Sequence, residues 1–171
     1  MKTVTLKSAA LLFSLAACLQ PLAALAQLGS PLPAGTGAGV HSPNSPFAPL
    51  PERADMLAWS MLSDVKTKAV KNRLLPQFPA PVQALNDTTQ RIQGFMMPLE
   101  PGEKQKHFLL SSVPLTCSFC VPGGPASMVE VRTKKQVKYS MEPVAVEGKF
   151  AVLADDSYGL YYRMVDAVSV K

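Results

Sequence analysis

Two cysteines three residues apart are the strongest candidates for chemistry in this chain. Cys117 and Cys120 form a C-x-x-C motif inside the stretch from His107 to Pro125. Such a pair can bind one metal ion as thiolates, close into a disulfide, or exchange thiols with a partner protein. The residues leave these three kinds of site open.

The nearest histidine to the motif is His107, which begins a predicted strand. The loop leaving that strand carries both cysteines, so a curled hairpin would bring the imidazole toward the sulfur atoms. We predict Cys117, Cys120 and His107 as ligands of zinc or copper(I), for which thiolate and imidazole are suitable donors. The alternative is that His107 is an exposed strand residue. A water molecule or one carboxylate would complete the site, from Glu103, Asp155 or Asp156.

Thiol exchange is the third alternative for the motif, and the residues after it argue against this one. Thiol oxidoreductases lower the pKa of the first cysteine at the N-terminus of a helix that begins at the motif. Pro122, Gly123, Gly124 and Pro125 prevent such a helix, so the motif is predicted to lie in a loop. The chain also lacks G-x-S-x-G, H-E-x-x-H and phosphate-binding glycine motifs. We expect no enzyme.

The first residues are typical of an export signal. Lys2 and Lys7 precede an apolar stretch that is too short to span a bilayer. Two outcomes remain open: a signal peptide over 1–26, or a lipoprotein signal over 1–17 with Cys18 acylated. The first predicts a periplasmic protein. The second predicts an outer-membrane lipoprotein facing the periplasm, with membrane contact only through the lipid on Cys18.

Composition divides the remainder into a linker and one domain. Residues 27–51 are rich in proline and glycine and predict an extended, mobile linker, in which His41 would be solvated. Residues 52–171 suffice for a single domain. Removal of Lys2 and Lys7 leaves 15 basic against 12 acidic residues, a net charge of +3. This mild excess makes nucleic acid an unexpected partner, and the basic run over 132–138 is predicted to be a solvated turn.

The domain is predicted to be mainly β, with one amphipathic helix at its start. The helix would be capped by Asp55, would bury one face that includes Trp59, and would end near Arg73, with an extended crossing over 76–81 after it. Alternating apolar residues then predict five strands, over 91–98, 107–112, 128–132, 144–152 and 160–168. Gly94 inside the first strand indicates a bulge or a sharp coil of the strand, either of which helps a small sheet curl. We therefore predict a small five-stranded curled sheet or an oligonucleotide/oligosaccharide-binding (OB)-like barrel.

Four motifs in order resemble a bacterial family. They are Gly94-Phe95-Met96-Met97-Pro98-Leu99-Glu100, His107-Phe108-Leu109-Leu110, Cys117-Ser118-Phe119-Cys120-Val121-Pro122-Gly123-Gly124-Pro125 and Val129-Glu130-Val131. The series is similar to the family called domain of unknown function 3299, over most of residues 57–165. The resemblance implies a secreted or periplasmic protein without established activity, associated with metal homeostasis beside envelope transport systems.

The resemblance also bears on the cysteines. Many family members have Cys-x-His followed by polyproline, so Cys117 matches their cysteine and Cys120 stands close to their histidine. Exchange of cysteine for histidine is easier to explain in a metal site than in a disulfide, which needs two sulfurs. The expected function is thus an exported metal-binding accessory protein, with an envelope transporter or a periplasmic metal-binding protein as partner. A disulfide-stapled structural or ligand-binding module is the alternative, and a thiol-disulfide oxidoreductase the third.

Overall fold

The structure is a computed structural model and describes residues 37–171. The predicted leader, both cleavage positions, Cys18 and the first part of the predicted linker lie outside these residues. Within 37–171, no helix is both long and apolar enough to cross a membrane.

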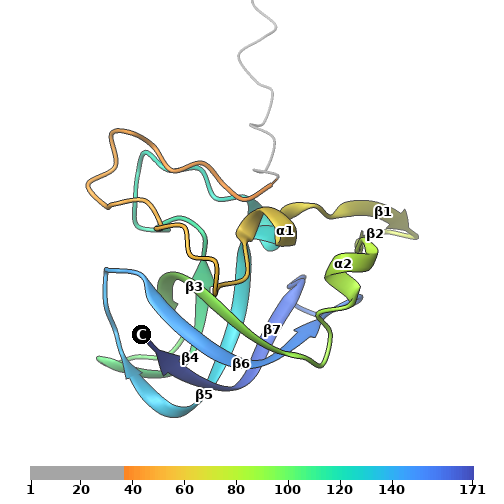
Figure 1. Cartoon of the computed structure of the whole chain (residues 1–171). Helices are drawn as coiled ribbons and strands as arrows, with labels where there is room; N and C mark the ends of the chain where they lie inside the picture. Colours follow the sequence, from red (N-terminus) through yellow and green to blue (C-terminus); the bar gives the residue numbers. More distant parts are fainter. Residues whose placement is uncertain (1–36) are drawn as a thin grey trace, which may run out of the picture. The chain divides into compact units, whose positions relative to one another are not determined.

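Five strands close into a barrel (Figure 1). They are β3 (Thr89–Pro98), β4 (Lys104–Ser111), β5 (Met128–Lys138), β6 (Val144–Val152) and β7 (Tyr162–Val170). Their order around the barrel is β3-β4-β5-β7-β6, and β6 pairs back with β3. The β5–β7 pair is parallel, while the other four pairs are antiparallel. The prediction of a mainly β, OB-like barrel is confirmed.

Small residues and bulges allow so short a sheet to close. The register shifts between Gln105 and His107 in β4, and β5 and β6 carry similar irregularities. At Gly94 a Cβ atom would lie 2.7 Å from the carbonyl oxygen of Ser111, on the neighbouring strand. Bulges increase local twist and glycine permits close backbone approach, so both help the sheet to curl.

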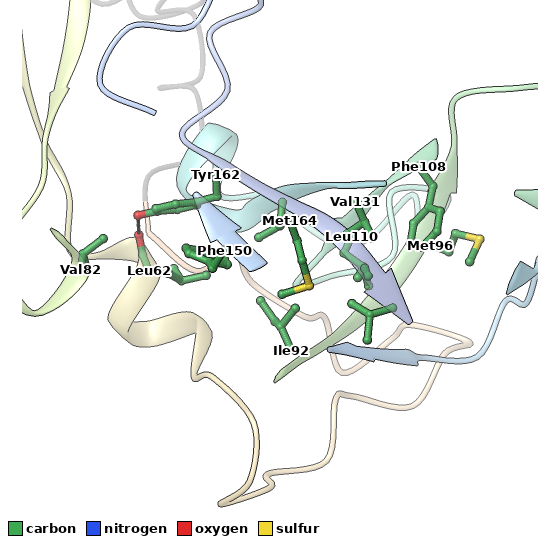
Figure 2. Packing of buried hydrophobic residues seen from close by; sticks show 13 residues of the cluster. Leu62, Val82, Ile92, Met96, Phe108, Leu110, Val131, Phe150, Tyr162 and Met164 are labelled. Carbon is green, nitrogen blue, oxygen red and sulfur yellow. Dashed lines mark hydrogen bonds between the residues drawn. The ribbon is translucent and has the colours of Figure 1, made fainter. Parts of the chain in front are cut away.

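The barrel interior is filled by the alternate residues of each strand. Figure 2 shows these side chains between the ribbons, among them Ile92, Leu110, Val131 and Met164, all fully buried. Burial of each such side chain stabilises the fold by about 1.5–3 kcal/mol. The period-two pattern of the sequence therefore identifies the core positions of the strands correctly.

The predicted N-terminal helix is confirmed only over five residues, and its N-cap is Ala58 rather than Asp55. Helix α1 spans only Trp59–Ser63, without a side-chain cap. The chain then forms a two-stranded sheet of β1 (Lys66–Val70) and β2 (Arg73–Gln77). Lys71 turns the chain between them with φ of 53°. Pro76 and the β-branched residues of β1 disfavour a helix here, and pairing of the two strands satisfies the backbone instead.

Two further predictions need correction. The crossing over 76–81 is not wholly extended, because helix α2 spans Ala80–Gln83 with a proline in its first turn, where a missing N–H is tolerated. The basic run after Arg132 is not a turn, because β5 continues to Lys138 and pairs there with Lys104. Basic side chains can lie on an exposed strand as readily as in a turn. The charge of this run therefore did not distinguish a strand from a turn.

Candidate functional site

The loop between β4 and β5 carries the C-x-x-C motif. Cys117 and Cys120 are bonded to each other as a disulfide, with Cα atoms 5.4 Å apart. The Cys120 amide donates to the Cys117 carbonyl at 3.2 Å, so the motif closes one tight turn. Cys117 is buried, with 6% of its surface exposed. The loop then enters a short 3-10 helix, η1 (Gly124–Ser127), which leads into β5.

The described part of the predicted linker lies on this loop. Val40 and Val121 form an isolated antiparallel bridge with backbone hydrogen bonds of 2.8 and 2.9 Å. The Ser112 hydroxyl donates to the carbonyl of Ala38, and the Cys117 sulfur lies 3.4 Å from the Ser45 hydroxyl. Residues 37–45 therefore form a segment, here named the strap, that is bound to the disulfide loop.

Gly123 is the position at which strap and loop come closest. A Cβ atom at Gly123 would lie 1.9 Å from the carbonyl oxygen of Gly37 and 2.5 Å from the amide nitrogen of Gly39. Neither distance is sterically possible, so the contact requires glycine. Gly123 after the motif thus has a packing role, which the sequence alone did not reveal.

The structure does not bring the three predicted metal ligands together. The cysteine sulfurs are bonded to each other, and His107 lies on β4 with its Nε2 2.7 Å from a carboxylate oxygen of Glu130. Among residues 37–171, no three His, Cys, Asp or Glu side chains are grouped so that they could hold a metal ion. The physical reason is the strand direction: β4 runs from His107 toward the loop, so four residues of ladder separate the imidazole from the loop.

The proposed fourth ligands are also engaged elsewhere or lie apart. Asp155 forms an ion pair with Arg73 of β2. Asp156 accepts hydrogen bonds from the amides of Tyr158 and Leu160, and lies 3.1 Å from Arg163. Glu103 precedes β4, at the end of that strand far from the disulfide. The other histidine, His41, belongs to the strap, and its Nε2 is buried without a hydrogen bond in the described structure.

A polar cluster around Glu130 is the feature that sequence reasoning missed. The Glu130 side chain is only 4% exposed although it lies on the outside of the barrel. Its carboxylate is bound by His107, by Arg132 at 2.9 and 3.0 Å, and by Arg163. The cluster joins β4, β5 and β7. The only sequence signal was one charged residue between two valines, Val129 and Val131, which indicates an outward position on a strand.

Electrostatics within the cluster favour the ionised carboxylate. Burial alone would raise the pKa of Glu130, but hydrogen bonds from Arg163, Arg132 and His107 outweigh burial and lower it. The pKa of Asp156 is also lowered, because two backbone amides and Arg163 outweigh its burial. Glu130 is therefore a fixed anion that orients the surrounding side chains, and it is poorly suited to accept a proton near neutral pH.

The comparisons with known proteins place the chain in a family. The family model described as "Protein of unknown function (DUF3299)" matches residues 50–167. The chain belongs to the DUF3299 family. The predicted resemblance is thereby confirmed, over the barrel, both helices and the disulfide loop.

One solved structure similar to this chain is a DUF3299 family protein from Pseudomonas aeruginosa PAO1. The two are 26% identical, with a TM-score of 0.39. The match covers 52% of this chain and 64% of the other, so this chain spans less than two thirds of that protein. The search of curated proteins finds no match.

Proposed function

We propose that this DUF3299 protein is an exported, non-catalytic binding module in which the Cys117–Cys120 disulfide is a structural clasp. The observation that supports this most is the strap. The disulfide closes the loop to which residues 37–45 are bound, and backbone contacts at Val121 and Gly123 make that binding close. A clasp is a natural use of a disulfide in an oxidising compartment.

The surroundings of the disulfide support a structural role over a redox role. An attacking thiol must be accessible and must have a lowered pKa. Cys117 is buried beside the strap, and the motif lies in a loop that enters only a four-residue 3-10 helix. This arrangement supports a structural clasp more than thiol exchange.

The outer face of β4, β5 and β7 is the proposed ligand face. In OB barrels the second and third strands, with the loops that flank them, bind ligands. Here those strands are β4 and β5, and the loop between β6 and β7 supplies Asp156 to the same cluster. Arg132 remains more than half exposed after binding Glu130, so it keeps donors for a ligand.

The clasp is tested by removing it. We expect Cys117→Ser/Cys120→Ser to fold, and to lower the free energy of unfolding by about 2 kcal/mol, because the closed loop is short. Ser118→Ala, in the same loop, is the control and should change little. The wild-type protein should show no turnover in insulin reduction. Turnover that depends on Cys117 would contradict the proposal.

A metal-binding accessory is the second candidate, supported by one observation about His107. Its Nε2 is held by Glu130, and its Nδ1 makes no hydrogen bond within the described residues. A carboxylate that fixes one imidazole nitrogen while the other binds metal is a common arrangement around metal ions. Zinc(II) and copper(I) titrations of the oxidised protein test this role. Binding that is lost in His107→Ala and kept in His41→Ala would support it, and absence of binding would remove it.

A further inference from the structure

An uncharged hollow opens at the end of the barrel where β5 turns into β6. Its volume is about 280 Å³, and it is lined by the end of β3, residues 114–116 and the turn at 139–141. None of its ten lining residues is Asp, Glu, Lys, Arg or His. Three are Met96, Met97 and Met141, whose unbranched thioether side chains adapt to ligands of varied shape.

Large apolar side chains stay uncovered around this hollow. Met141 is 56% exposed, Leu99 43% and Met97 39%. Isolated exposed apolar residues are ordinary on protein surfaces, but a group of them beside a concave site indicates a ligand. The hollow is therefore suited to an apolar group.

Lysines gather on the strands beside the hollow. Lys104 and Lys138 lie directly opposite each other across β4 and β5, and Lys138 precedes the lining residue Tyr139. Figure 1 shows the start of β4 and the end of β5 at the barrel end away from α1 and α2. Like charges placed opposite each other on a ladder repel. An anion bound between them would relieve that repulsion.

Among the described residues, the lysines at this rim have no carboxylate partner. Within residues 37–171, Lys149 is the lysine that forms an ion pair, with Asp87 at 3.0 Å, and it lies on β6. Glu103 and Glu142 also lie at this end of the barrel, next to Lys104 and Met141 in the chain, and neither forms an ion pair in the described structure. Neutralising either acid should therefore strengthen the binding of an anion at this end, whereas neutralising a lysine should weaken it.

We infer that the hollow binds a single-chain anionic amphiphile, of the fatty acid type. The apolar chain occupies the space among Met96, Met97 and Met141, and the acidic headgroup lies at Lys104 and Lys138. A water molecule occupies about 30 Å³ in the liquid, and a methylene group is of similar size, so the volume suits a chain of roughly nine carbons. This site is separate from the Glu130 cluster, although part of its lining, Pro114 to Thr116, directly precedes Cys117 in the disulfide loop.

The test uses decanoate as the probe and the ε-methyl signals of ¹³C-labelled methionine as the readout. Decanoate below its micellar concentration should shift the signals of Met96, Met97 and Met141 in a saturable way. Decyltrimethylammonium, with the same chain and a cationic headgroup, should bind more weakly. Equal binding of the two would overturn the assignment, because the lysines would then play no part.

Four variants of exposed residues separate the effects of headgroup charge and of the apolar hollow from effects on folding. Lys138→Gln should weaken decanoate binding by a factor of about 2 to 5, and Glu142→Gln should tighten it by a similar factor. Lys66→Gln, on β1, is the matched control and should leave the dissociation constant unchanged. Met141→Asp should abolish the shifts. Equal changes of the dissociation constant in Lys138→Gln and Lys66→Gln would contradict the proposed site.

A bilayer is the alternative source of an acidic amphiphile. Phosphatidylglycerol vesicles and phosphatidylcholine vesicles, mixed with the protein and sedimented, distinguish the two. The inference predicts that decanoate binds the free protein and that vesicles do not compete at equal lipid concentration. Sedimentation with phosphatidylglycerol vesicles, together with no decanoate shift, would make this end a membrane-binding surface and overturn the single-chain site.

Discussion

At the scale of single residues, Glu130 carries the most specific prediction. Its buried carboxylate is bound by two guanidinium groups and an imidazole, so Glu130→Gln leaves three donors with a neutral partner. Hydrogen bonds to charged groups contribute roughly 1.5–3 kcal/mol, and we expect a loss of about 2 kcal/mol in the free energy of unfolding by urea at pH 7. Glu147→Gln breaks the exposed ion pair with Arg91 and should cost less than about 1 kcal/mol. Equal losses would contradict this account of the cluster.

The same residue predicts a pH dependence. The folded-state pKa of Glu130 lies below its ordinary value of 4.5. The carboxylate therefore contributes its full stability above about pH 4.5, and this contribution is lost as the pH falls from there through the folded-state pKa. The difference in unfolding free energy between wild type and Glu130→Gln should shrink over that range. A difference that grows below pH 4.5 would contradict a lowered pKa of Glu130 in the folded state.

Sequence reasoning identified some of these residues but not their partners. His107 was correctly placed on a strand, with an exposed outward position as one of the alternatives. The sequence pattern indicated only that Glu130 points outward from a strand. Its partner Arg163 could not be predicted, because Arg163 reaches Glu130 through the parallel pairing of β5 and β7. That pairing joins residues 33 apart in the chain, and no local pattern specifies it.

At the scale of elements, the strap and the disulfide loop act as one unit. Gly123 has φ of −83°, which alanine accepts, so Gly123→Ala tests the close contact without backbone strain. We expect the strap to detach, with hydrogen-exchange protection of the Val40 and Val121 amides reduced at least about tenfold.

Gly102→Ala is the control for that variant. A Cβ atom there meets no other atom within 4 Å, although φ of 108° strains the alanine backbone. It should lower global stability by about 1 kcal/mol and leave the Val40 amide protected. Retained protection in Gly123→Ala would contradict the clasp.

The elements also show where local patterns are sufficient. Strand β6 matches its predicted bounds, because alternation over nine residues leaves no other period. The segment after Ser63 was predicted as helix because its apolar spacing fits both a helix and a short hairpin. Pairing of β1 with β2 decides between them, and that pairing depends on Pro76 and on the turn at Lys71.

At the scale of the whole molecule, the five strands of the barrel and the class of fold were predictable from alternation and from Gly94, whereas the additional strands β1 and β2 were not predicted. The order of strands around the barrel comes from non-local contacts, and the disulfide state of Cys117 and Cys120 comes from their position in the fold. The C-x-x-C spacing is compatible with metal, disulfide or exchange, so only the position of His107 and the strap favours a clasp.

The most direct test of the clasp is the mass of the protein purified without reductant after expression in an oxidising compartment. Native mass spectrometry should find the chain about 2 Da lighter than after reduction, with no metal bound at the motif. Alkylation without reduction should leave Cys117 and Cys120 unmodified. A full reduced mass carrying zinc or copper, with both cysteines alkylated only after a chelator is added, would contradict the account and restore the cysteines as metal ligands.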